Sequence, residues 1–194
     1  MNPLQEARFL LRITRTQGIV RRYFVVNGFD GALTMLGLIT GFSVSAPASP
    51  SLIISACLGA GIALGVSGVS SAYVSESAER RRALEELQMA MGTDLGDSFH
   101  GRAARWVPML IALVNGLAPL VISLLILIPL WLAEAGLELP FAPLSASIAI
   151  ALLLIFLLGV FLGRISGVSW WLSGFKTLLI ALVTATLITL IAGD

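Results

Sequence analysis

Five long apolar runs dominate the pattern of hydrophobic and polar positions along the chain. They cover roughly residues 23–44, 51–75, 107–133, 144–163 and 172–192. A helix needs about 20 apolar residues to cross a bilayer, so each run is long enough to span one. The runs are continuously apolar, whereas the strands of a membrane barrel alternate between apolar and polar residues. The pattern therefore predicts an all-α, polytopic membrane protein with five transmembrane helices.

The polar residues divide the chain between these spans. A basic N-terminal segment (1–22) precedes the first two spans (23–75), and a polar segment (76–106) separates them from the last three spans (107–194). Opposite charges four residues apart support a helix, which predicts that the second span continues as a helix into the polar segment. The pairs are Glu76/Arg80, Arg81/Glu85 and Arg82/Glu86.

Two residues of the polar segment and several glycines give further structural signals. Gly92 is predicted to end the extended second helix, and Thr93 to cap a short helix that follows. Glycines four residues apart let membrane helices approach closely, which predicts packing contacts. These pairs are Gly37/Gly41, Gly61/Gly65 and Gly159/Gly163.

Composition agrees with a membrane protein and excludes several other classes. The mean hydropathy is +0.96 and only 12% of residues are charged, against about 25% in soluble domains. The single cysteine, Cys57, rules out a disulfide framework or a cysteine metal cage within the chain. The expected environment is the lipid bilayer, and no nucleic acid partner is expected.

The distribution of basic residues predicts the orientation. All 12 Lys and Arg residues lie before the first span, between the second and third, or around the join of the fourth and fifth. With five spans, these regions share one side, which the positive-inside rule assigns to the cytoplasm. The N-terminus is then cytoplasmic and the C-terminus outside or lumenal. The motif "RRYFVV" with a later "VSAPA" also imitates a cleavable twin-arginine signal, but the apolar run is too long and contains an aspartate.

That aspartate, Asp30, is the one acidic residue well inside a predicted span. A charged side chain at mid-membrane costs at least about 2.5–3.5 kcal/mol, and such groups commonly mark ion or proton sites. Thr34 lies one turn later on the same helix face, followed by Gly37 and Gly41. The alternative is that the span begins near Gly31 and that Asp30 caps it at the interface.

Other polar groups within the spans extend this possible path. Ser67 and Ser71 stand one turn apart in the second span, where serines also serve ordinary helix packing. In the third span, Pro119 lacks the amide that would bond to the carbonyl of Asn115, which frees an oxygen beside the asparagine side chain. The alternative for this pair is an ordinary proline kink.

The polar segment is rich in carboxylates and holds the single histidine, His100. Carboxylates with one imidazole suit Mn²⁺ or Fe²⁺, and Asp94, Asp97 and His100 could share a broad helix face. The alternative is that these charges only solvate a juxtamembrane helix. No nucleophile elbow, phosphate loop or paired zinc motif is present, so we expect neither an enzyme nor a permanently bound cofactor.

Three stretches resemble the vacuolar iron transporter family. "NGFDGALTMLGLITGFS" resembles its first span, with an Asp-Gly followed by a small-residue helix. "GIALGVSGVSSAYVSESAER" is similar to its second span, and "LGVFLGRISGVSWWLSGFKTLLIALVTATLITLIAG" to its last two. The number of spans and the insertion between the second and third also match.

The resemblance implies a homodimer that moves Fe²⁺ or Mn²⁺ out of the cytoplasm in exchange for protons. The intramembrane aspartate of the family corresponds to Asp30. The family's second-span methionine falls near Gly68, and an acidic or amide residue near Ala72, so both side chains differ here. The cytoplasmic metal-binding residues of the family have Glu79, Glu85 and Glu86 as partial counterparts.

Two functional hypotheses follow. The first is a divalent metal cation transporter in which Asp30 binds the cation and releases a proton. Its path would be lined by Thr34, Ser67, Ser71 and Asn115, and its cytoplasmic acids would gather ions. The second is a non-transporting membrane scaffold or regulator that binds a partner through residues 76–106.

Overall fold

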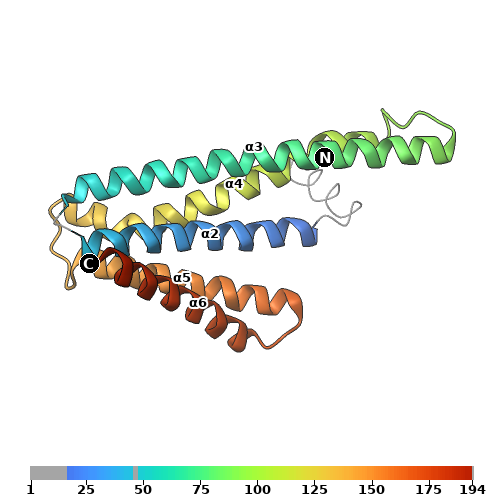
Figure 1. The fold of residues 1–194 in the computed structure, drawn as a ribbon. Coiled ribbons are helices and arrows are strands. Elements are labelled where there is room, and N and C mark those ends of the chain that lie inside the picture. The colour runs from blue at the N-terminus through green and yellow to red at the C-terminus, as the bar shows by residue number, and fades with distance from the viewer. Residues whose placement is uncertain (1–16, 46–47, 194) are drawn as a thin grey trace. The chain divides into compact units, whose positions relative to one another are not determined.

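The computed structural model describes residues 17–45 and 48–193, and this part of the chain is helical with no strand (Figure 1). The helices follow in the order α2 (Gln17–Val44), α3 (Pro50–Met91), α4 (Phe99–Glu134), α5 (Pro143–Ser166) and α6 (Trp170–Ala192). Each is long and apolar enough to cross a membrane. The chain is therefore a multi-pass membrane protein, and the prediction of five spanning helices is confirmed. Most of the basic N-terminal segment lies outside the described residues.

The first three helices extend well beyond their apolar runs. α3 has 42 residues, which at 1.5 Å per residue is about 63 Å, roughly twice the hydrocarbon thickness of a bilayer. The polar segment 76–106 is thus formed by the end of α3 and the start of α4 with a turn between them. Nε of Arg81 lies 3.0 Å from Glu85, and Nε of Arg82 lies 3.1 Å from Glu86, so these i,i+4 pairs support the extension as predicted.

The turn between α3 and α4 confirms one terminus prediction and corrects another. α3 ends at Met91, and Gly92 has a φ of 64°, which favours glycine. The prediction that Thr93 caps the next helix is wrong, because α4 begins only at Phe99. Its cap is Ser98, whose Oγ accepts from the amides of His100 at 3.1 Å and Gly101 at 3.2 Å.

The chain forms two compact units. One holds the chain up to Phe24 together with Val66–Leu117, and the other holds Val25–Gly65 and Ala118–Asp194. In the first unit, the beginning of α2 packs on α4, and the end of α3 and the start of α4 line an open pocket of about 140 Å³. The apolar contact joins Ile19, Val20 and Tyr23 to Ala103, Val107 and Ile111.

The second unit has a large apolar core to which all five helices contribute. Its fully buried side chains are apolar and most are aliphatic, as expected for helices that pack along their length. They include Met35, Leu36 and Ile39 of α2, Cys57 of α3, Ile126 and Leu127 of α4, Ile155 of α5 and Ala181 of α6. This core fixes which face of α2 is turned inward.

Helices α5 and α6 form a hairpin held at glycines. A Cβ placed on Gly163 would lie 2.7 Å from Cα of Trp170, and Gly159 lies against Ser173 and Thr177 in the same way. The predicted packing role of Gly159 and Gly163 is therefore confirmed, as is that of Gly61, whose Cβ would lie 3.2 Å from Cβ of Ser123. Gly41 has no neighbour at such a distance, so its predicted contact is absent from the described residues.

Candidate functional site

Asp30 lies in the middle of α2, on the side that faces away from the packed core. Its side chain is exposed and Thr34, one turn later, is half-buried. Ala32, Leu36 and Ile39, which lie on the opposite side of α2, are fully buried. The carboxylate is 13 residues into a helix that begins at Gln17, so the part of the alternative in which Asp30 caps the helix is wrong.

The glycines around Asp30 fix how this part of α2 packs. A Cβ on Gly31 would lie only 2.7 Å from Cα of Pro119 in α4, and one on Gly28 would meet Leu158 of α5 at 3.5 Å. A side chain at Gly31 would therefore collide with the α4 backbone. The close contact at Gly31 holds α2 in the orientation that leaves the neighbouring Asp30 on the outside.

The other predicted path residues lie in the first unit. Ser67 and Ser71 of α3 are exposed, whereas Asn115 of α4 is buried. The Asn115 side-chain amide donates to the carbonyl of Gly68 at 2.7 Å. Asn115 therefore joins α3 to α4, a positioning contact that spacing alone did not predict.

Gly68, where the resemblance places a methionine, stands at the same helix crossing. A Cβ on Gly68 would lie 3.1 Å from both the Asn115 carbonyl oxygen and Cα of Gly116. A larger side chain would push the two backbones apart. The absence of a methionine here thus has a packing reason, because α3 and α4 approach too closely to accommodate one.

The glutamates proposed to gather metal are separate from one another. Glu79, Glu85 and Glu86 are exposed on α3, and the last two are held by the arginines four residues earlier. Among residues 17–45 and 48–193, no group of three or more His, Cys, Asp or Glu side chains is placed to hold a metal ion.

The proposed shared helix face of Asp94, Asp97 and His100 is wrong. Both aspartates precede α4, which begins at Phe99. Asp94 Oδ1 accepts from the side-chain amide of Gln88 at 2.6 Å and from the Gly96 backbone at 2.9 Å. It shapes the turn, because a carboxylate that accepts from a backbone amide two residues on stabilises a turn.

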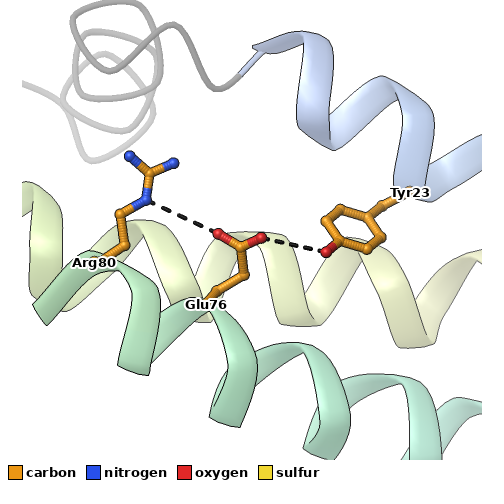
Figure 2. Close-up of polar contacts among 3 residues, drawn as sticks. All are labelled: Tyr23, Glu76 and Arg80. Carbon is orange, nitrogen blue, oxygen red and sulfur yellow. Dashed lines mark hydrogen bonds and ion pairs between the residues drawn. The ribbon is translucent and has the colours of Figure 1, made fainter. Parts of the chain in front are cut away.

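A polar cluster that sequence reasoning found only in part lies between α2 and α3. Figure 2 shows the Glu76 carboxylate between Tyr23 and Arg80. The Tyr23 hydroxyl donates to Oε1 at 3.3 Å, and Nε of Arg80 lies 3.9 Å from Oε2. The Glu76/Arg80 pair was predicted from its i,i+4 spacing, but the hydrogen bond to Tyr23 was not, because it joins residues 53 positions apart.

The sequence of the chain is similar to that of an uncharacterized protein. No protein-family model matches the chain, and no solved structure matches it. The uncharacterized protein MJ0645 of Methanocaldococcus jannaschii is 35% identical over 169 residues, which cover 86% of this chain and 85% of the relative. Identity at this level along nearly the full length of both proteins shows common descent. The chain belongs to the same family as MJ0645.

Proposed function

We propose that this protein is a divalent metal cation transporter that exports Fe²⁺ or Mn²⁺ from the cytoplasm in exchange for protons. The observation that carries the proposal is Asp30, a carboxylate in the middle of an apolar spanning helix and outside its packed core. Such a group marks an ion pathway more often than a structural contact. The resemblance to the vacuolar iron transporter family supports the same function.

In this proposal the cytoplasm is on the side of the basic residues. Asp30 binds the cation and releases a proton, and Thr34, Ser67 and Ser71 line the path. The buried Asn115 positions α3 against α4 through the carbonyl of Gly68. The exposed glutamates of α3 raise the local concentration of cations at the cytoplasmic end.

The exposed position of Asp30 also supports the proposed homodimer. A carboxylate facing lipid would cost at least about 2.5–3.5 kcal/mol. A second copy of the chain that packs its own α2 against this face would remove Asp30 and Thr34 from lipid. On the same face, Gly37 already packs against Ile188 of α6, whereas Gly41 has no neighbour within 4 Å of a Cβ and lets a second helix approach closely.

A cysteine at Thr34 should therefore form a disulfide between two copies. The variant is Thr34→Cys in a Cys57→Ser background, oxidised in native membranes and analysed on a non-reducing gel. Equivalent residues near a two-fold axis face one another, and a disulfide requires Cα atoms within about 7 Å. Leu179→Cys, on the exposed side of α6, is the matched control and should stay monomeric. The reverse pattern would assign the interface to α6.

Transport itself is tested with purified protein in liposomes. We expect uptake of Mn²⁺ or Fe²⁺ along an opposing pH gradient, together with proton movement in the other direction. A panel of divalent cations, including Ca²⁺ and Zn²⁺, establishes selectivity. Empty liposomes give the background leak, and flux no greater than this leak for every cation would refute the proposal.

The second candidate is a membrane scaffold that binds a partner through residues 76–106. It is favoured by the ion pairs that engage Glu85 and Glu86 and by the ordered turn between α3 and α4. In that case, the segment would retain a partner protein in a pull-down, and no divalent cation would shift the melting temperature. Proton-coupled metal flux would exclude it as the main function.

A further inference from the structure

Glu76 differs from the other glutamates of the polar segment because it is shielded from solvent. Its side chain is 13% exposed and that of its partner Arg80 is 19% exposed. Glu85 and Glu86, further along the same helix, are 56% and 61% exposed. A charged juxtamembrane helix normally carries carboxylates for solvation, and that explanation does not apply to a carboxylate that water barely reaches.

Although Glu76 is shielded from solvent, its polar contacts are longer than those of the exposed Glu85 and Glu86. Glu85 and Glu86 have arginine nitrogens at 3.0 and 3.1 Å, whereas Glu76 has a hydroxyl at 3.3 Å and a guanidinium nitrogen at 3.9 Å. Strong contacts to an ionised carboxylate are shorter, about 2.5–2.9 Å. Glu76 is therefore a shielded carboxylate with long contacts, and a carboxylate within reach of a hydroxyl can exchange a proton with its surroundings.

The hydrogen-bond partner of Glu76 lies on the face of α2 that carries Asp30. Tyr23 and Asp30 are seven residues apart in one continuous helix, and seven residues bring a side chain back to the same face. The rise along α2 between them is about 10 Å. The Tyr23 hydroxyl both donates and accepts hydrogen bonds, so it links Glu76 of α3 to this face of α2.

The charged surroundings of Glu76 favour a proton over a metal ion. Arg80 of α3 contacts the carboxylate directly, and Arg22 precedes its other contact, Tyr23. α4 contributes His100 to the pocket that Arg80 also lines. A divalent cation would meet a guanidinium at this site, and no group of three or more ligating side chains occurs in the described residues. A proton requires only the one carboxylate.

We propose that Glu76 is the residue that delivers transported protons to the cytoplasm. A proton that arrives along the polar face of α2 adds to a carboxylate oxygen of Glu76. It is then lost to cytoplasmic water, which regenerates the carboxylate. Tyr23 holds the carboxylate next to α2 through its hydroxyl. This inference rests on the proposed metal–proton exchange.

The test separates net exchange from metal–metal exchange in liposomes. Glu76→Gln should lower proton-coupled Mn²⁺ flux by about 100-fold, the usual contribution of a positioned proton-transfer group. The same variant should still exchange internal Mn²⁺ for external labelled Mn²⁺, which requires no net proton movement. Tyr23→Phe, which removes only the hydroxyl, should slow net flux by a smaller factor. Glu134→Gln, an exposed glutamate at the end of α4, is the matched control and should resemble the wild type.

Each outcome is decisive. Loss of net flux with retained metal–metal exchange supports the role of Glu76 and also shows that the variant is folded. Net flux equal to that of the wild type, or loss of both kinds of flux in protein that remains monodisperse, overturns it. If the wild-type protein itself moves no metal, the proposed function fails first, and this inference falls with it.

Discussion

Replacing Asp30 with asparagine is expected to abolish proton-driven Mn²⁺ or Fe²⁺ flux in liposomes. Asparagine has nearly the same shape as aspartate but neither the negative charge nor the ability to release a proton. Two unit charges about 4 Å apart interact by about 4 kcal/mol near a protein surface. A divalent cation doubles this attraction, so loss of the carboxylate should weaken cation binding by at least about a thousandfold, since every 1.4 kcal/mol is a factor of ten.

Two companion variants identify the cause of that loss. Asp30→Glu keeps the charge on the same face of α2 and should retain measurable flux. Glu138→Gln removes an exposed carboxylate from the connection between α4 and α5 and should leave flux unchanged. Because asparagine removes a charge from the membrane, Asp30→Asn should not lower the melting temperature. Wild-type flux in Asp30→Asn would remove Asp30 from the mechanism.

The helices could be predicted from the sequence because the membrane imposes a simple requirement. A chain in lipid must satisfy its backbone hydrogen bonds internally, so every apolar run of sufficient length becomes a helix. The extension of α3 was also predictable, because Arg81/Glu85 and Arg82/Glu86 are local pairs. The residue at which α4 begins could not be predicted, because Thr93 and Ser98 are both good caps. The turn that Asp94 stabilises decides which of the two residues caps the helix.

The candidate site was predictable only where the signal is local. Asp30 is conspicuous in any sequence because a carboxylate in an apolar run is costly. The hydrogen bonds from Tyr23 to Glu76 and from Asn115 to Gly68 join residues 53 and 47 positions apart. Such contacts depend on which helix faces meet, and helix periodicity gives the faces but not their partners. The contact between Glu76 and Tyr23 therefore emerges only from the fold.

Gly68 shows how the packing changes the meaning of a sequence difference. Compared with the family it resembles, the chain lacks a methionine that would supply a soft ligand for Fe²⁺. The close approach of Gly68 to Asn115 and Gly116 indicates that the difference is coupled to the helix crossing. Any metal preference then depends on oxygen ligands, which suit Mn²⁺ better than a thioether does.

Gly68→Met should consequently destabilise the protein and should not create an iron site. Cβ alone would lie 3.1 Å from the Asn115 carbonyl oxygen and from Cα of Gly116, and the remaining side chain would force α3 from α4 and stretch the 2.7 Å bond of Asn115. Overpacking of this kind costs about 1–3 kcal/mol and occasionally more. In a chain of this size, that corresponds to a fall in melting temperature of about 2–4 °C per kcal/mol.

The measurement is thermal unfolding of the purified protein in detergent, with Gly59→Met as the matched control. Gly59 also lies in the spanning helix α3, but a Cβ there meets nothing within 4 Å, so its methionine can extend without displacing a backbone. The two variants add the same side chain, and their difference in melting temperature therefore isolates the helix crossing. Equal melting temperatures, or a gain of Fe²⁺ over Mn²⁺ flux in Gly68→Met alone, would show that α3 and α4 separate enough at this point to admit a ligand.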